Sequence, residues 1–232
     1  MELKILGISG SPVRGGNVDT FLAKALESVD RPETVIETAF LSESKVQDCI
    51  QCNFCWRKQE EHRYCVLDDD AQALFEKAET ADVIVLATPV YIMRTSARMA
   101  AFLDRMRLFL FGNLTAGRLR NKVGVSLAVS WSRNAGLETA HLSHLFAFGI
   151  FEMIPAAVHD SVSPMGGSAV SSEHGMGVFD RDIRLGVLRD EGGLASGRKI
   201  MERAVELAEI VKYGSRRRAA ARDNHIARGR NR

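Results

Sequence analysis

Four cysteines that could hold a metal or an iron-sulfur cluster all lie between residues 49 and 65 of a 232-residue chain. They are Cys49, Cys52, Cys55 and Cys65, and the sequence contains no other cysteine. Three thiolates separated by two residues each can occupy three corners of a cubane, and a fourth completes it. Structural zinc more often uses two separated Cys-x-x-Cys pairs. The spacing therefore favours a [4Fe-4S] cluster, with zinc as the alternative.

A second candidate site follows the first apolar segment, in residues 9–17, which read Ser-Gly-Ser-Pro-Val-Arg-Gly-Gly-Asn. Hydroxyl and amide donors here precede a helical pattern, and a helix N-terminus with free N–H groups favours a phosphate. The segment is neither a G-x-G-x-x-G fingerprint nor a P-loop, which needs Gly-Lys-Ser/Thr. We expect a phosphate site here, with an ordinary strand-to-helix turn as the alternative.

Two further loops place aromatic residues after apolar segments. One is Thr88-Pro89-Val90-Tyr91, and the other begins with Ser130-Trp131 and continues to Gly136. In a parallel α/β sheet, loops at the carboxyl ends of the strands converge on one ligand crevice. We expect both loops to lie beside the phosphate site, although a Tyr or a Trp at a strand end is also compatible with a core or rim position.

These three loops need strands that end at one edge of a sheet, and the hydrophobic pattern predicts such strands. Residues 82–87 form a continuous apolar run, which indicates burial on both faces of a parallel sheet. The predicted strands are residues 3–9, 34–40, 82–87, 122–129 and 152–158, and the predicted helices are residues 18–29, 69–81, 96–111, 137–148 and 194–212. Their alternation predicts an α/β fold with a doubly wound, five-stranded parallel sheet.

One domain, residues 1–214, is expected to contain both sites, with the cysteines on a long loop at residues 41–68. Residues 215–232 contain seven arginines and one aspartate. They lack apolar periodicity and are predicted to form a disordered basic tail. A solvated tail, a cap on a neighbouring subunit and a nucleic-acid arm are the alternatives for its role. The Gly/Ser-rich residues 161–177 are assigned no role.

The composition is that of a globular protein in water, with 46% hydrophobic residues, 26% charged residues and a net charge of +2. The longest apolar runs fall well short of the roughly 20 residues that a membrane-spanning helix needs. Glu2 and Lys4 interrupt the first apolar run, so we expect no signal peptide. The expected location is the cytoplasm, where disulfides are rare.

Taken in this order, the motifs resemble those of the flavodoxin-like NAD(P)H-dependent FMN reductases. The resemblance includes Asp68-Asp69-Asp70 after Cys65 and the pair Asp104-Arg105, and it spans about residues 3–140. The triplet Cys49-x-x-Cys52-x-x-Cys55 is similar to that of the iron-sulfur flavoprotein branch. The resemblance implies a flavodoxin-like fold that binds FMN and, at the four cysteines, a [4Fe-4S] cluster. Cluster-free members of the family also carry cysteines at these positions.

The resemblance assigns FMN-binding positions residue by residue, with the phosphate in the first loop and the isoalloxazine ring along the second. The implied FMN-binding residues are Ser9, Ser11, Pro12, Arg14, Asn17, Val18, Thr88, Pro89, Val90, Tyr91, Ser130 and Trp131. Val13 stands where the family usually has arginine, and Val18 stands where it usually has a hydroxyl residue.

The expected function is FMN-dependent electron transfer, in which the cluster passes electrons to FMN and FMN reduces a small molecule or a quinone. The cofactors supply this chemistry, so no catalytic side chain is assigned. A ferredoxin-like protein or NAD(P)H is the expected donor, and the family implies a homodimer or homotetramer. The alternatives are a cluster-free NAD(P)H-dependent FMN or quinone reductase, and a redox sensor or nucleic-acid-associated protein that acts through the basic tail.

Overall fold

A computed structural model describes residues 2–159, 162–178 and 184–230, with side chains as far as residue 218. Its centre is a parallel sheet with the strand order β2-β1-β3-β4-β5, and β6 also pairs with β4. The strands are β1 (Leu3–Ser9), β2 (Thr34–Phe40), β3 (Val83–Pro89), β4 (Val123–Ser130), β5 (Ile154–Pro155) and β6 (Gly167–Val170). The prediction of a doubly wound parallel sheet is confirmed.

The order of the strands reverses direction between β1 and β3, which pair in parallel with Ile5 opposite Val83. In this fold class, the reversal opens a crevice at the carboxyl ends of the strands. Every residue of β3 and of β4 is buried, as the continuous apolar run at residues 82–87 predicted. The central strands are thus covered on both faces, and their ends present the loops that follow Ser9, Pro89 and Ser130.

The predicted fifth strand is wrong in its extent. β5 contains only two residues, which pair with Val123 and Gly124 at the start of β4. β6 pairs with Leu127 to Ser130 at the end of β4. Two short strands, β5 and β6, therefore pair with β4 where a single longer strand was predicted. The second strand arises within residues 161–177, whose small side chains permit close packing: a Cβ on Gly167 would lie 2.5 Å from Leu127. Residues 160–161 lie outside the described part of the chain.

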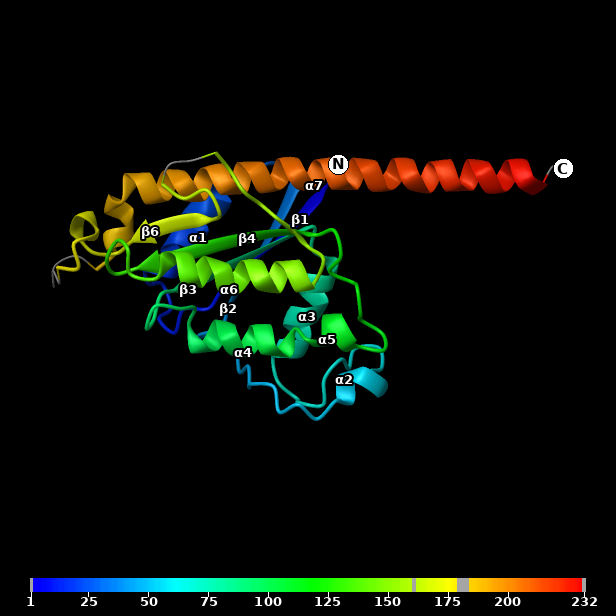
Figure 1. Cartoon of the computed structure of the whole chain (residues 1–232), viewed down its shortest axis with the longest axis horizontal. Helices are drawn as coiled ribbons and strands as arrows, with labels where there is room; N and C mark the ends of the chain where they lie inside the picture. Colours follow the sequence, from blue (N-terminus) through cyan, green and yellow to red (C-terminus); the bar gives the residue numbers. More distant parts are fainter. Residues whose placement is uncertain (1, 160–161, 179–183, 231–232) are drawn as a thin grey trace.

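Helices cover both faces of the sheet (Figure 1). The helices are α1 (Asn17–Glu27), α2 (Phe54–Arg57), α3 (Ala71–Thr80), α4 (Ala97–Arg105), α5 (Leu108–Phe111), α6 (Leu137–Ile150) and α7 (Glu191–Arg230). On one face, α1 and α7 bury Phe21 and Ile200 against the sheet. On the other, α3 and α4 stack Phe75 and Phe102, whose ring centroids lie 5.8 Å apart. The predicted helix over residues 96–111 is divided into α4 and α5.

The last helix differs most from the sequence-based expectation. α7 continues to Arg230, so residues 215–230 are helical where a disordered tail was predicted. Figure 1 shows this end projecting beyond the sheet. Its sequence consists largely of arginine and alanine, which are strong helix formers even without tertiary contacts. Across the described ranges, no helix combines the length and hydrophobicity that crossing a membrane requires.

Candidate functional site

A cavity of about 260 Å³ lies at the carboxyl ends of β1, β3 and β4, and we call it the strand-end cavity. It is formed by the three loops that the sequence singled out, which meet as expected for the switch point of a parallel sheet. Nine of the twelve predicted FMN-binding residues line it. They are Ser11, Arg14, Asn17, Val18, Pro89, Val90, Tyr91, Ser130 and Trp131.

Three predicted residues, Ser9, Pro12 and Thr88, are not among the residues that line the cavity. Ser9 is fully buried, and its Oγ donates to Asp19 Oδ1 at 2.6 Å. Thr88 is also buried, and its Oγ1 accepts from the backbone N–H of Ser96 at 3.0 Å. Both hydroxyls therefore stabilise the loops through hydrogen bonds inside the protein and do not point into the cavity.

The lining also includes residues that were not predicted. Gly15 and Gly16 belong to the first loop, whereas Ser171, Arg184 and Leu185 come from a region that carried no recognised signal. Ser171 follows β6, and recognition of that short strand would have placed Ser171 at the same edge of the sheet. No motif in the sequence indicates Arg184, because only the return of the chain toward α7 brings it to the cavity.

The N-terminus of α1 supplies the anion-binding part of the cavity. Among the described residues, no side chain caps this helix at Gly16. The amide groups of its first turn, together with the helix dipole, therefore favour a bound phosphate. Gly15 has a φ of +66°, a conformation that costs little only for glycine. This turn directs the loop around the end of the helix.

Asp19 organises the same loop from within. Its carboxylate is buried and accepts from the Gly15 N–H at 2.7 Å and from Arg14 Nη1 at 3.1 Å. Arg14 also donates to Glu43 at 2.9 Å and lies 3.5 Å above the ring centre of Phe40. The guanidinium is therefore held at the rim of the cavity by two carboxylates and a ring.

The aromatic residues of the strand-end cavity are accessible to a ligand. Tyr91 is 46% exposed and Trp131 is 51% exposed, which places both at the mouth and not in the core. An uncapped helix N-terminus beside two accessible rings fits a molecule with a phosphate at one end and a planar ring at the other. The residues present in this cavity therefore fit FMN.

The cysteines lie elsewhere, on the loop of residues 41–68, which we call the cysteine loop. Cys55 is buried at the start of α2, Cys49 and Cys65 are half-buried, Cys52 is exposed, and all four thiols are free. Cys49 lines a second cavity of about 690 Å³ between α4 and α6, which we call the helix-face cavity. The lining of the strand-end cavity, as far as the structure describes it, includes no cysteine.

The donor chemistry of the cysteine loop fits an iron-sulfur cluster, but its side-chain positions are not those of a formed metal site. Within the described part of the chain, no three Cys, His, Asp or Glu side chains are arranged to hold a metal ion. Burial raises the pKa of the Cys55 thiol, Arg107 acts in the opposite direction, and the charges of the other three cysteines raise it further. Four cysteine sulfurs are a soft donor set, which suits iron or zinc once the thiols are deprotonated.

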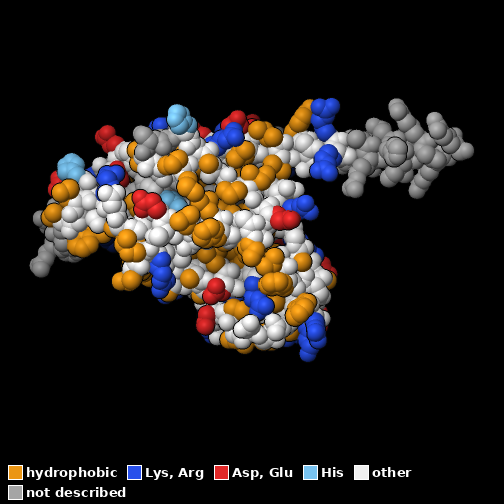
Figure 2. Space-filling view, viewed as in Figure 1, with side chains coloured by type: hydrophobic (Ala, Val, Ile, Leu, Met, Phe, Trp, Pro, Cys, Tyr) orange, Lys and Arg blue, Asp and Glu red, His pale blue; other side chains and the backbone are white. Residues whose placement is uncertain are grey.

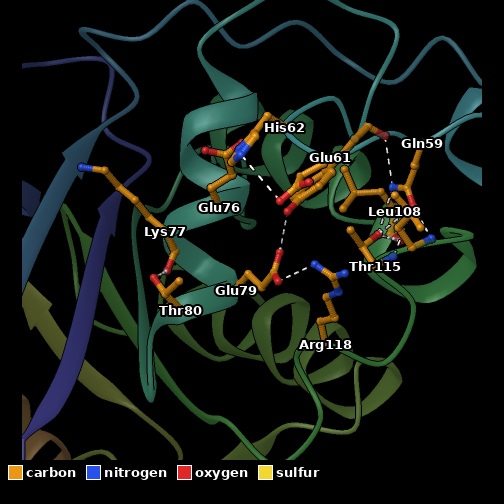
Figure 3. A network of polar contacts seen from close by, with 12 residues as sticks. Gln59, Glu61, His62, Glu76, Lys77, Glu79, Thr80, Leu108, Thr115 and Arg118 are labelled. Carbon is orange, nitrogen blue, oxygen red and sulfur yellow. Dashed lines mark hydrogen bonds and ion pairs between the residues drawn. The ribbon is translucent and has the colours of Figure 1, made fainter.

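Polar side chains attach the cysteine loop to α3 and to the turn segment that contains Thr115 and Arg118. Gln59 is buried, and its Nε2 donates to Thr115 Oγ1 at 2.9 Å. Tyr64 donates through its hydroxyl to Glu79 at 2.8 Å, and Glu79 also pairs with Arg118. Figure 3 shows this network between α3 and the residues near Thr115. The loop is thus ordered through side-chain hydrogen bonds, although it has little regular structure.

Comparison with known proteins gives a consistent result. Residues 3–163 match the model of the family described as NADPH-dependent FMN reductase. An iron-sulfur flavoprotein of Methanocaldococcus jannaschii is 33% identical over 90% of this chain and 100% of its own length. An iron-sulfur flavoprotein of Methanosarcina thermophila is 40% identical over 59% of this chain and 68% of its own.

Solved structures support the same fold at lower sequence similarity. RosB with bound 8-demethyl-8-formylriboflavin-5'-phosphate is similar with a TM-score of 0.67 at 16% identity, over 96% of this chain and 87% of that chain. An FMN-dependent NADH-azoreductase from Bacillus anthracis in complex with FMN gives a TM-score of 0.53 at 15% identity, over 88% of this chain and 99% of that chain. These similarities confirm the flavodoxin-like fold.

Proposed function

Because the chain belongs to the NADPH-dependent FMN reductase family, with iron-sulfur flavoproteins among its relatives, we propose that a [4Fe-4S] cluster at its four cysteines passes electrons to FMN. The family membership makes the chain an FMN-dependent oxidoreductase. The observation that carries the proposal is the meeting of nine predicted FMN-binding residues around one cavity, in a chain whose four thiols all lie on one separate, ordered loop.

In the proposed complex, the strand-end cavity holds FMN. The first-turn amides of α1, with Ser11, Arg14 and Asn17, would hold the phosphate, while Pro89 to Tyr91 and Trp131 would lie along the ring. FMN supplies the redox chemistry, and the side chains bind and orient it. Ser9 and Asp19 act on the loop through their hydrogen bond. Because Tyr91 and Trp131 are half-exposed, a small acceptor such as a quinone can approach from the mouth.

The four cysteines, Cys49, Cys52, Cys55 and Cys65, would hold the cluster, with a ferredoxin-like protein as the electron donor in the cytoplasm. Assembly into a homodimer or homotetramer is part of the proposal. The outer face of α6 supports it, because Leu142, Phe146 and Ile150 recur at intervals of one helical turn and are 38%, 72% and 56% exposed. Figure 2 shows hydrophobic side chains gathered over this helix. A contiguous exposed apolar surface of this kind is typical of a subunit interface.

The test is anaerobic purification followed by a visible spectrum and quantification of iron, sulfide, zinc and FMN. We expect FMN together with about four iron and four sulfide ions per chain. Cys52→Ser should abolish the iron while leaving the FMN, because Cys52 is not part of the strand-end cavity. A colourless protein that does not take up added FMN would contradict the flavin site, and one zinc per chain would contradict the cluster.

A second candidate is a cluster-free NAD(P)H-dependent FMN or quinone reductase that uses the same cavity. The observation that favours it is the arrangement of the thiols, which do not form a metal site in the described residues. NADPH would then bleach the flavin rapidly without a ferredoxin, and Cys52→Ser would leave the rate unchanged. Iron-dependent flavin reduction would exclude this candidate.

A further inference from the structure

Arg107, which lies between α4 and α5, faces one part of the cysteine loop. Its Nη2 donates to Asn53 Oδ1 at 3.3 Å, and Arg107 lines the helix-face cavity together with Cys49. Asn53 precedes α2, in which Cys55 is buried two residues further on. The guanidinium of Arg107 is thus close to the segment that contains Cys49, Cys52 and Cys55.

Arg105, at the end of α4, faces the other part of the loop. Its guanidinium donates to Asp69 at 2.9 and 3.1 Å, and both side chains are almost completely buried. Its Nη1 also donates to the backbone carbonyl of Gln47 at 3.0 Å, two residues before Cys49. Its Nε has no hydrogen-bond partner among the described residues. Asp69 and Gln47 therefore hold a buried guanidinium against the cysteine loop and leave one of its donors unpaired among the described residues.

We propose that Arg107 and Arg105 are positioning residues of the cysteine site. Their fixed positive charges attract anionic sulfur-containing molecules to the cysteine loop and set the potential of the cluster held there. A cluster bound by four thiolates becomes more negative when it gains an electron. Nearby cations stabilise that reduced state, because cluster potentials follow net charge and hydrogen bonding to sulfur. The role in the cluster rests on the proposed function, whereas the electrostatic effect on the thiols does not.

The first experiment uses the full chain without iron. The cysteines react with an anionic aromatic disulfide, DTNB, and with an uncharged one, dithiodipyridine, and the ratio of the two rates cancels the thiolate fraction common to both. Arg107→Gln should lower the ratio of anionic to uncharged rates by about threefold, the size expected for one charge acting partly through water. Arg105→Lys, which keeps the charge, should leave the ratio close to that of the wild type.

The matched control is Arg57→Gln, which removes one arginine charge from the cysteine loop itself. Arg57 lies in α2, where it is exposed, and its guanidinium lies 5.4 Å from the ring centre of Trp56. We expect Arg57→Gln to leave the rate ratio within experimental error of the wild type. Equal ratios in Arg107→Gln and Arg57→Gln would overturn the proposal.

The second experiment uses the cluster-loaded protein and measures oxidised and reduced cluster at a set electrode potential. Arg107→Gln should increase the ratio of oxidised to reduced cluster about tenfold, equivalent to a potential lower by 59 mV for a one-electron couple. A merely structural role would leave this potential unchanged. If the wild type binds no iron but Arg107→Gln still lowers the ratio of the DTNB rate to the dithiodipyridine rate, the proposal of a cluster is wrong and the electrostatic inference stands.

Discussion

The strand-end cavity and the cysteine loop are held in place by different forces. Backbone pairing of β1, β3 and β4 fixes the three strand ends, and every residue of β3 and β4 is buried. The cysteine loop instead depends on side-chain contacts such as Gln59 with Thr115, and on the buried pair of Arg105 and Asp69, which binds the backbone of Gln47. One site is therefore defined by the sheet and the other by a few polar pairs. The two sites should respond differently to point substitutions.

The largest expected effect follows from removal of Arg105. Arg105→Met leaves the Asp69 carboxylate buried without its partner, which should lower the free energy of unfolding by about 3 to 5 kcal/mol. Urea denaturation followed by circular dichroism measures this loss. The variant Asp69→Asn/Arg105→Met should lose less, since no unpaired charge then remains. Because the pair anchors the cysteine loop, folded Arg105→Met should retain FMN better than iron, and equal loss of both would contradict the contrast.

Acid should destabilise the protein through two buried histidines on α6. Burial lowers the pKa of His141 to about 4 and that of His144 to about 3, from 6.5, and Ser126 Oγ lies within hydrogen-bonding distance of both, 2.7 and 2.8 Å from their Nδ1 atoms. The unfolded chain therefore binds more protons below pH 6.5. The contribution of the two neutral histidines to the free energy of unfolding should be complete above pH 6.5. It should decrease as the pH falls toward 4, by about 3 kcal/mol for His141 alone.

The acid effect is measured by urea denaturation at several pH values. His174 supplies the control because its side chain is 85% exposed, and His174→Gln should leave the pH profile unchanged. His141→Asn should reduce the slope between pH 6.5 and 4. A wild-type profile that is flat over this range would contradict the buried, neutral state of both imidazoles.

A smaller effect is expected at the phosphate loop. Asp19→Ala removes the acceptor for Ser9, Gly15 and Arg14, which should loosen the loop at a cost of about 1 to 3 kcal/mol. FMN affinity, measured by fluorescence quenching, should fall about tenfold, which corresponds to roughly 1.4 kcal/mol. Asp30→Ala, an exposed change just after α1, is the control. Unchanged FMN affinity in Asp19→Ala would show that the sheet alone orders this loop.

The smallest effect is expected from truncation after residue 214. Neither cavity includes a residue of this segment among its lining, as far as the structure describes it. FMN content, iron content and flavin reduction should stay within about twofold of the full chain, whereas binding of nucleic acid through seven arginines would be lost. Loss of FMN on truncation would mean that this basic segment supports the flavin site.

The sequence by itself determined the sheet and the strand-end cavity. Continuous apolar runs identify strands buried on both faces, and the carboxyl ends of such strands must meet, so the positions of Ser11, Tyr91 and Trp131 at one cavity could be predicted. The four cysteines were likewise evident from their spacing. Local pattern suffices for the cavity because the backbone pairing of parallel strands places the loops that follow them at one edge of the sheet.

Only the tertiary structure decided which predicted residues face the cavity and what surrounds the thiols. Ser9 and Thr88 turn inward because Asp19 and Ser96 provide partners there, and no spacing rule reveals those partners. β6 escaped prediction because four small residues form a strand only when packed beneath α7. Arg105 and Arg107 meet the cysteine loop at Gln47 and Asn53, 58 and 54 residues away in sequence, since packing of α4 and α5 against the loop, and not local periodicity, brings their charges there.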